Sequence, residues 1–415
     1  MDDDPRRVVE HVARDSYGRL VAYLSARTHD VAAAEDALAD AFVAALRTWP
    51  RDGLPNNPEA WLFTAARRRL IDQARHERTR ADAAQTIRLL VRQEDDVSDS
   101  VFPDERLKLL FVCAHPEIDA AVHTPLMLQV VLGLDAATIG SAFLTSPAAM
   151  GQRLSRAKAR IREADVAFEI PDRQELPARL DAVLDAIYAA YGSGWDDLAG
   201  ADPRRRGLAQ EAIWLARMVL QLLPDEPEAR GLLALMLYCE ARRVARRAAG
   251  GDYVPMSEQD TSLWDAPMID EAESMLHAAA AAQRVGRFQL EAALQSAHIE
   301  GARHGRTDWQ GIAALYEGLV RTAPTIGALV GRAAALGEAR GPVTGLAELD
   351  AIDPQIVKTY QPFWAVRAHL LAEAGRSREA ADAFDRAIGL TEDGATRQFL
   401  LRRRQQTERA DLNRH

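Results

Sequence analysis

Two clusters of positively charged side chains in the first 165 residues could bind nucleic acid. The first cluster holds six arginines between residues 57 and 80, namely Arg67, Arg68, Arg69, Arg75, Arg78 and Arg80. The second lies between residues 151 and 162 and has five cations and no acid, namely Arg153, Arg156, Lys158, Arg160 and Arg162. Such local clusters can pair with phosphate groups even though the whole chain carries a net charge of −10.

The second cluster lies on a predicted helix whose other face is apolar. Ser146 can cap this helix and Pro147 suits its first turn. The apolar face follows at steps of four, three and four residues and consists of Met150, Leu154, Ala157 and Ile161. A shorter helix with Ile139 and Phe143 comes before it, across a turn at residues 144–146. This order predicts a helix-turn-helix motif, whose second helix enters the major groove of DNA. An ordinary helical hairpin with a solvated basic face is the alternative.

Helical periodicity dominates the rest of the chain, and no convincing period of two predicts a strand. Three helices are predicted before residue 80, at residues 5–25, 31–48 and 58–78. The second is predicted to end at Trp49-Pro50, before a loop rich in Gly, Pro and Asn at residues 51–57. Abundant alanine and only 6% aromatic residues favour closely packed helices, so the predicted fold class is all-α.

A two-helix repeat is predicted close to the C-terminus. Within residues 361–392, seven residues match the spacing of the tetratricopeptide (TPR) pattern: Trp364, Ala368, Leu371, Gly375, Ala380, Phe384 and Ala387. A weaker copy lies at residues 312–345, and a loop at residues 250–265 interrupts the series. Pro224 and Pro324 each follow a predicted helix and stand 100 residues apart, close to three repeats of about 34 residues. The C-terminal half is therefore expected to form a TPR-like helical array.

Three segments, in order along the chain, resemble the extracytoplasmic-function (ECF) sigma factors. Residues 34–42, followed by Trp49-Pro50, resemble region 2.2 of that family. Residues 57–63, with the arginine run that follows and Asp72, resemble regions 2.3 and 2.4, and the helix-turn-helix falls where region 4.2 is expected. The remainder resembles a subgroup with a TPR-like C-terminal extension, so the chain is identified as a member of this family over nearly its whole length.

The resemblance implies four parts along the chain. A hydrophilic stretch at residues 93–100 reads as a linker. The implied parts are a sigma-2 domain at residues 1–85, a flexible linker at 86–103, a helix-turn-helix sigma-4 domain at 104–168 and a TPR-like regulatory domain at 169–415.

An acidic patch in the first domain is implied to bind RNA polymerase core. Glu35, Asp36 and Asp40 are one and four residues apart, so they share one side of a helix. The family resemblance places them against the basic clamp coiled coil of the largest polymerase subunit, where arginines can pair with them. The polymerase flap is a further implied contact. A merely solvated acidic face is the alternative.

The resemblance also implies contacts with the −10 element of promoter DNA. The loop at residues 51–57, with Asn56 and Asn57, would receive a flipped base. The cations of the following helix would be Arg67, Arg68, Arg69 and Arg75. Trp61 and Phe63 could stack on bases, although Trp61 also fits an inward apolar face of the helix.

Contacts with the −35 element are implied for the second helix of the helix-turn-helix. The candidate residues are Ser146, Ala148, Gln152, Arg153, Arg156 and Arg160. Gln152 and Arg153 are the best placed to read base edges. Arg156 and Arg160 suit phosphate contacts, which position the protein on the DNA without selecting a base sequence. Gly151 stands where many family members carry Lys or Arg, so the preferred promoter sequence stays open.

A polar triplet on the loop of the extension is the last candidate site. Glu258, Gln259 and Asp260 stand in the place of an Asp-Gln-Asp motif of the subgroup. Such a triplet could regulate the protein through intramolecular contacts between the C-terminal domain and the sigma domains. A solvated loop is the alternative.

No catalytic motif accompanies these sites. The sequence has no Walker A, dinucleotide-binding, His-Glu-x-x-His or Gly-x-Ser-x-Gly motif, and its ten histidines show no ligand spacing, so no enzyme, metal site or cofactor is expected. No apolar run approaches the roughly 18 residues of a membrane span, and the acidic start differs from a signal peptide, so a cytoplasmic protein is expected. A DNA-binding regulator without polymerase function and a TPR scaffold protein remain as alternatives.

Overall fold

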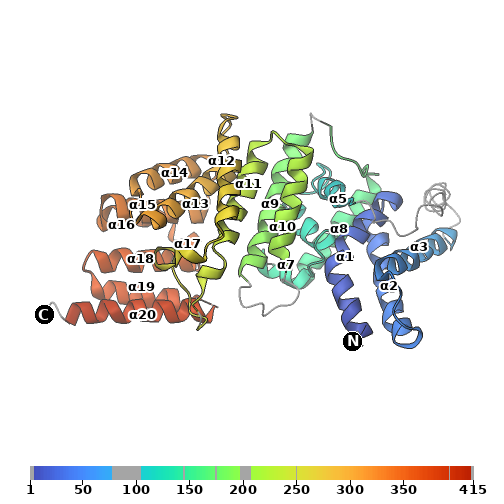
Figure 1. Cartoon of the computed structure of the whole chain (residues 1–415), viewed down its shortest axis with the longest axis horizontal. Coiled ribbons are helices and arrows are strands. Elements are labelled where there is room, and N and C mark those ends of the chain that lie inside the picture. Colours follow the sequence, from blue (N-terminus) through green and yellow to red (C-terminus); the bar gives the residue numbers. More distant parts are fainter. Residues whose placement is uncertain are drawn as a thin grey trace. The chain divides into compact units, whose positions relative to one another are not determined.

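The computed structural model describes residues 4–76, 104–143, 145–172, 175–196, 207–248, 250–391 and 393–412. Within these ranges the chain forms helices joined by loops, and the one β feature is an isolated bridge between Arg247 and Tyr253 (Figure 1). The all-α prediction is therefore confirmed. No helix in this part of the chain is both long and apolar enough to cross a membrane. Two compact units are present, Met1–Val219 and Leu220–His415, and the predicted linker at residues 86–103 falls entirely outside the described residues.

The first unit begins with three helices that pack on one another. They are α1 (Pro5–Thr28), α2 (Val31–Asp52) and α3 (Pro58–His76). The Asp30 side chain caps the start of α2 by accepting a hydrogen bond from the Ala33 amide at 3.0 Å. In the first turn of α3, Glu59 accepts hydrogen bonds from Ser16 and Arg19 of α1. These polar contacts, together with the buried apolar faces, make the three helices one bundle.

The end of α2 differs from the prediction, which placed it at Trp49-Pro50. The helix continues to Asp52, so Pro50 lies within its last turn. Proline removes one backbone donor there, while the buried Trp49 anchors the same turn in the core. Gly53 then ends the helix with a φ of 88°, and its amide donates to the Trp49 carbonyl at 3.1 Å. The predicted end was wrong because packing of Trp49 outweighs the loss of a single hydrogen bond.

The next four helices among the described residues contain the predicted helix-turn-helix arrangement. They are α5 (Arg106–Cys113), α6 (Ala120–Val130), α7 (Ala136–Ala142) and α8 (Pro147–Glu163). Ser146 caps α8 by accepting a hydrogen bond from the Ala149 amide at 3.3 Å, and Pro147 is its first residue. The predicted apolar face of α8 is confirmed, because its buried residues are Met150, Leu154, Ala157 and Ile161. Between α6 and α7, Gly133 turns the chain with a φ of 68°.

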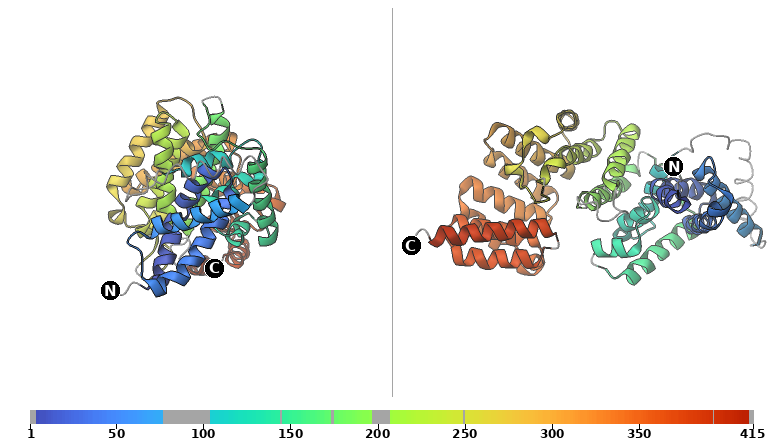
Figure 2. Two further views of the ribbon diagram at one scale, coloured as in Figure 1. Left: turned by 90° about the vertical axis from the view of Figure 1, so that its right-hand side faces the viewer. Right: turned by 60° about the horizontal axis from the view of Figure 1, so that its bottom comes forward.

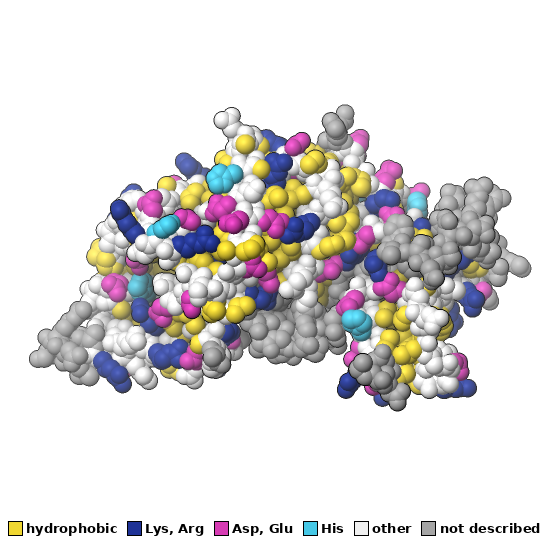
Figure 3. Space-filling view, viewed as in Figure 1, with side chains coloured by type: hydrophobic (Ala, Val, Ile, Leu, Met, Phe, Trp, Pro, Cys, Tyr) yellow, Lys and Arg dark blue, Asp and Glu magenta, His cyan; other side chains and the backbone are white. Residues whose placement is uncertain are grey.

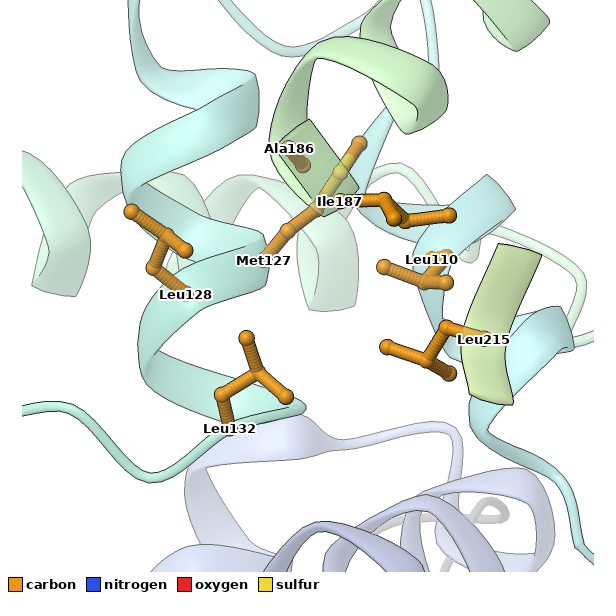
Figure 4. A pocket seen from close by; sticks show the side chains of 7 residues that line it. All are labelled: Leu110, Met127, Leu128, Leu132, Ala186, Ile187 and Leu215. Atoms are coloured by element: carbon orange, nitrogen blue, oxygen red, sulfur yellow. The ribbon is translucent and has the colours of Figure 1, made fainter. Parts of the chain in front are cut away.

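Two more helices of the first unit, α9 (Leu176–Asp196) and α10 (Leu208–Leu222), extend the core built by α5 and α6. Side chains from these four helices and the turn after α6 line a small pocket (Figure 4): Leu110, Met127, Leu128, Leu132, Ala186, Ile187 and Leu215. Because all seven side chains are apolar, the pocket has no polar group that could orient a ligand, and we interpret it as a small gap in the packing of the core. Helices on both sides of residue 168 thus share one core, while the division of the chain into the four predicted parts stays a prediction.

Arg106 links α5 to α10 at the edge of this core. Its guanidinium forms an ion pair with Glu211 and lies 4.2 Å from the centre of the Trp214 ring. Asp104 holds the same guanidinium from the other side at 2.7 Å. The start of the predicted sigma-4 domain is therefore tied to a helix of the predicted C-terminal domain within the first unit.

The second unit is a succession of helices that pack mainly on their neighbours in sequence (Figures 1 and 2). Within residues 361–392, α18 (Gln361–Glu373) and α19 (Ser377–Gly389) pack on each other. Of the residues of the predicted pattern, Ala368, Leu371, Ala380, Phe384 and Ala387 are buried, Trp364 is half-buried, and Gly375 lies between the helices with a φ of 74°. The TPR-like repeat itself stays a prediction. Figure 2 shows α18, α19 and the last helix, α20, side by side. The helices of this unit are α11 (Pro227–Ala241), α12 (Ala266–Ala280), α13 (Arg287–His304), α14 (Trp309–Thr322), α15 (Ile326–Arg340), α16 (Pro342–Asp350), α17 (Pro354–Val357), α18 (Gln361–Glu373), α19 (Ser377–Gly389) and α20 (Gly394–Leu412).

The loop between α11 and α12 contacts the region of α20, far along the chain. Three contacts make this connection: Arg247 with Asp393 at 3.1 Å, Asp252 with Arg402 at 3.0 Å, and the rings of Tyr253 and Phe399 at 5.4 Å. In an open repeat array each repeat contacts only its neighbours. This loop therefore joins the beginning of the second unit to its end.

Candidate nucleic-acid interface

Helix α8 presents polar side chains to solvent on the side opposite to its buried face. Gln152, Arg153 and Arg156 are all exposed, and Arg156 Nη2 lies 3.5 Å from Gln152 Oε1 one turn away. Among the described residues neither Arg153 nor Arg156 has a carboxylate partner, so both guanidinium groups can take phosphate. Ser146 and Ala148 are exposed at the N-terminal end of the same helix. All six predicted −35 residues are therefore exposed, and Arg160 alone of them forms an ion pair among the described residues.

The other three cations of α8 are paired with acids of other segments. The pairs are Arg160 with Glu117, Lys158 with Glu35 at 2.7 Å, and Arg162 with Asp30 at 3.5 Å. A phosphate group would have to displace Glu117 to reach Arg160, so Arg156 is the better phosphate contact of the two. Acidic and basic side chains are also interspersed on the face of the molecule in Figure 3.

Glu35 is the one predicted polymerase contact that the structure largely buries. Tyr17 of α1 donates a hydrogen bond to Glu35 Oε1 at 3.0 Å, and Lys158 Nζ of α8 lies 2.7 Å from Oε2. The side chains of Lys158 and Glu35 are only 15% and 12% exposed. Burial, followed by the nearby Glu35 carboxylate, raises the pKa of Tyr17, so its hydroxyl keeps the proton that it donates. Both oxygens of Glu35 are thus occupied within the first unit.

Asp36 and Asp40, in contrast, lie on the exposed side of α2. Asp40 Oδ2 is 3.9 Å from Arg69 Nε, and both side chains remain well exposed. Val43 and Leu46 continue the same side of the helix, and each is 45% exposed. The sequence analysis did not single out these two apolar residues, although their helical spacing from the acids could have shown that they share a surface. We call this surface, made by Asp36, Asp40, Val43 and Leu46, the acidic–apolar face of α2.

The first basic cluster lies on α3 and beyond it. Arg68 and Arg69 are exposed, whereas Arg67 is half-buried. Arg75 lies in α3, but its side chain is outside the described part of the structure, as are the remaining two arginines of the cluster. Two of the four predicted −10 cations, Arg68 and Arg69, are therefore exposed, and Arg69 also lies near Asp40.

The two asparagines before α3 have different surroundings. Asn57 Oδ1 accepts a hydrogen bond from the Ala60 amide at 3.1 Å and so caps the helix. Asn56 is exposed and makes no such contact among the described residues. Of the pair, Asn56 is thus the freer side chain for a base, while Asn57 fixes the start of α3.

The two aromatic residues of α3 contribute to packing. Phe63 is buried and meets the Tyr23 ring edge to face, with ring centres 5.2 Å apart. Trp61 is half-buried and packs in the same way against Trp49 at 5.4 Å. Phe63 is therefore unavailable for stacking on a base, and Trp61 retains only part of its surface.

The polar triplet of the second unit helps to shape its own loop. Gln259 is buried and donates to the Val254 carbonyl at 3.2 Å. Asp260 accepts hydrogen bonds from the amide and hydroxyl of Ser262 at 2.9 and 2.7 Å, and these bonds lower the pKa of Asp260. Glu258 is exposed. The regulatory role of the triplet stays a prediction, with only its two acids accessible.

No group of His, Cys, Asp or Glu side chains among the described residues is arranged to hold a metal ion. The two cysteines, Cys113 and Cys239, are unpaired, and burial raises the pKa of both thiols. Neither is therefore a reactive thiolate at neutral pH.

Comparison with known proteins connects this geometry to transcription. Residues 12–80, which span α1 to α3, match sigma-70 region 2, and residues 179–280 match a family of unknown function, DUF6596. An uncharacterized protein of Rhizobium meliloti (strain 1021) is 37% identical over 389 residues, which cover 92% of this chain and 91% of that protein. No solved structure matches the chain.

Region 2 is a part of transcription initiation factors, which bind RNA polymerase core and promoter DNA and are not enzymes. Its match covers the acidic–apolar face of α2 and the arginines of α3. The Rhizobium relative is similar over nearly the whole length of both chains. The chain therefore belongs to the same family as this relative, and its match to region 2 supports a sigma-70 family factor with a sigma-factor-like role in transcription initiation.

Proposed function

We propose that this protein is an ECF-type sigma factor that directs RNA polymerase core to particular promoters in the cytoplasm. In this proposal α2 binds the clamp coiled coil of the polymerase, α3 and the loop before it bind the −10 element, and α8 binds the −35 element. The helices of the second unit act as a TPR-like regulator of the same chain.

The observation that carries the proposal is the acidic–apolar face of α2, which lies inside the matched region 2. Asp36 and Asp40 can form charge-assisted hydrogen bonds with cations of a basic coiled coil. Val43 and Leu46 next to them add apolar area that is lost from water on binding. Acids beside exposed apolar side chains are the composition expected of a protein-binding surface with a polar rim.

The outward side of α8 supports the DNA-binding part of the proposal. Gln152 and Arg153 follow closely on the helix N-terminus, the part that reaches base edges in helix-turn-helix proteins. Arg156 lies one turn later and suits a phosphate contact. On α3, Arg68 and Arg69 can hold the backbone near a base that Asn56 receives.

Transcription in vitro with purified core polymerase and a library of promoter sequences tests the proposal. We expect the full chain to select a subset of promoters and to start transcription from them. Asp36→Lys with Asp40→Lys should abolish this activity by weakening core binding, because lysines would then face a basic coiled coil. The matched control is Glu10→Lys, which reverses an exposed acid of α1 and should leave transcription unchanged.

Two other functions remain as outcomes of this experiment. Promoter binding without transcription, and equal behaviour of the double variant and its control, would indicate a DNA-binding regulator that does not use polymerase core. Absence of any promoter preference would indicate a TPR scaffold with incidental basic segments.

A further inference from the structure

Gly151 lies in the interior of α8, where glycine lowers the stability of a helix. Glycine is less favourable there than alanine, because it loses more backbone freedom on folding. Its backbone is ordinary helix, so no positive φ requires a glycine at this position. A Cβ atom built on Gly151 meets nothing within 4 Å. The described part of the folded chain therefore gives no reason for the missing side chain.

Other glycines inside helices have a clear role in packing. A Cβ atom on Gly140 of α7 would lie 2.6 Å from the Thr145 carbonyl oxygen, and one on Gly231 of α11 would lie 2.6 Å from a backbone nitrogen of α13. Both helices thus need glycine so that another backbone can approach closely. Gly192 of α9, like Gly151, meets nothing within 4 Å at the Cβ position and so supplies a control. The close approach that would explain Gly151 must come from a molecule other than this chain.

The position of Gly151 on α8 points to DNA as that molecule. The helix begins at Pro147, so Gly151 lies in its N-terminal part, which reaches base edges in helix-turn-helix proteins. The exposed side chains of Gln152 and Arg153 follow directly. Arg156, one turn further on, has no carboxylate partner among the described residues and can take a phosphate group. The gap at Gly151 thus lies among the side chains that the proposed function places against the −35 element.

A base-edge group that lies against Gly151 must be apolar. Gly151 has no side chain, and its amide and carbonyl groups are bonded within the helix, as in any helix interior. A donor or acceptor of a base would lose its water there without gaining a partner, which is unfavourable. Among the groups that bases present in the major groove, the C5-methyl group of thymine is apolar. A methyl group is also the size of the side chain that Gly151 lacks in comparison with alanine.

We propose that Gly151 leaves a methyl-sized recess on α8 that receives the C5-methyl group of a thymine in the −35 element. This inference rests on the proposed function in one respect, namely that α8 reads the −35 element in the major groove. A side chain at residue 151 would occupy the space of the methyl group. The glycine therefore lowers the stability of the helix but selects a thymine at one position of the promoter.

The experiment measures how tightly the full-length protein, assembled with core polymerase, binds duplexes of a promoter selected in the transcription library. Each thymine of the −35 element is replaced in turn by uracil, which lacks only the methyl group. The unaltered protein should bind one of these duplexes about fourfold more weakly, because the burial of one methyl group is lost. Gly151→Ala should bind the thymine duplex about tenfold more weakly, because two methyl groups then compete for one space. On that uracil duplex Gly151→Ala should bind within about twofold of the unaltered protein, because the alanine methyl group takes the vacant place.

Two controls and one measurement of folding accompany this comparison. Gly192→Ala makes the same change on α9 and should bind every duplex as the unaltered protein does. Uracil in place of thymine between the −35 and −10 elements should leave the affinity of all variants unchanged. Hydrogen exchange in α8 should be about two- to fivefold slower in Gly151→Ala than in the unaltered protein, because alanine is the better helix former. The same substitution should thus stabilise α8 and weaken its binding to DNA.

Equal affinity of Gly151→Ala and the unaltered protein for the thymine duplex would overturn the inference. A loss in Gly151→Ala that is the same on every uracil duplex would also overturn it, because the clash would then not involve a thymine methyl group. Faster hydrogen exchange in α8 of that variant would show that the glycine has a role within the fold, with the same consequence. Selective promoter binding that no thymine methyl group affects would overturn the inference alone. Binding without preference among −35 sequences would instead refute the proposed function, and the inference with it.

Discussion

Replacement of Gly18 by alanine should weaken the contact between α1 and the end of α6. The added Cβ atom would lie 1.7 Å from the Val131 carbonyl oxygen, a backbone atom that cannot rotate away. Non-bonded heavy atoms prefer separations of about 3.5 Å, so the two backbones must move apart by roughly 2 Å. The clash explains why α1 keeps a glycine in its interior, where alanine would be the better helix former.

The magnitude follows from two opposing effects. Overpacking of a rigid contact costs about 3 kcal/mol, the upper end of the usual range, because no side chain can yield. Alanine returns about 1 kcal/mol through its higher helix propensity. The contact should thus be weaker by about 2 kcal/mol, which corresponds to roughly 30-fold in an opening equilibrium.

Hydrogen exchange of the full-length protein, followed by mass spectrometry, measures this effect. Peptides from α6 and α7 should exchange roughly 30-fold faster in Gly18→Ala, because local opening exposes their amides. The matched control is Gly151→Ala, since a Cβ atom there meets nothing within 4 Å. That variant should slow exchange in α8 through a gain of about 0.5–1 kcal/mol. Exchange in Gly18→Ala as slow as in the unaltered protein would refute the reasoning.

Three further predictions concern DNA recognition, acid stability and packing. Gln152→Ala should reduce the preference among −35 sequences by about 1–3 kcal/mol, whereas Arg156→Ala should weaken all duplexes alike; equal effects in binding titrations would argue against base reading by Gln152. Desolvation raises the pKa of Asp393, but hydrogen bonds from Thr396 and Arg247 outweigh it and lower that pKa to about 2. Because the folded pKa lies below the ordinary value of 3.8, ionised Asp393 stabilises the second unit fully above pH 3.8, and this stabilisation is lost as the pH falls toward 2. Acid unfolding titrations of Asp393→Asn and of the unaltered protein measure the difference. Phe384→Ala should lower the free energy of unfolding of the second unit by about 3–5 kcal/mol in urea titrations, because the ring is buried between α18 and α19; a loss below 1 kcal/mol would contradict this packing.

Helix α8 illustrates how far local signals carry a prediction. Its cap Ser146, its first residue Pro147 and its buried face were all expected from the sequence, and the structure confirms them. These features depend on residues within one or two turns of each other, so their spacing alone contains the information. The end of α2 shows the limit of local signals. Whether the helix continues past Pro50 depends on the burial of Trp49, and Trp61 of α3 packs against Trp49.

The sequence predicts which charged residues make up the candidate site, but not which of them form ion pairs with one another. Both basic clusters and the acids of α2 can be identified from the sequence. The apolar periodicity also predicts which face of a helix is exposed and which is buried. Nothing in the spacing indicates that, among the described residues, Arg153 and Arg156 have no carboxylate partner while Arg160 pairs with Glu117. The choice depends on which segment packs beside each guanidinium.

By itself, the sequence determined the helices, their caps, the apolar stripe of α8 and the charged residues that a nucleic acid or a polymerase could contact. Periodicity and capping act over a few residues, so these properties do not depend on the rest of the chain. Only the tertiary structure decided that Lys158 meets Glu35, 123 residues away, and that Glu35 is largely buried while Asp36 and Asp40 stay exposed. That pairing exists because α1, α2, α6 and α8 pack closely enough to exclude water from both charges, a consequence of the whole core of the first unit.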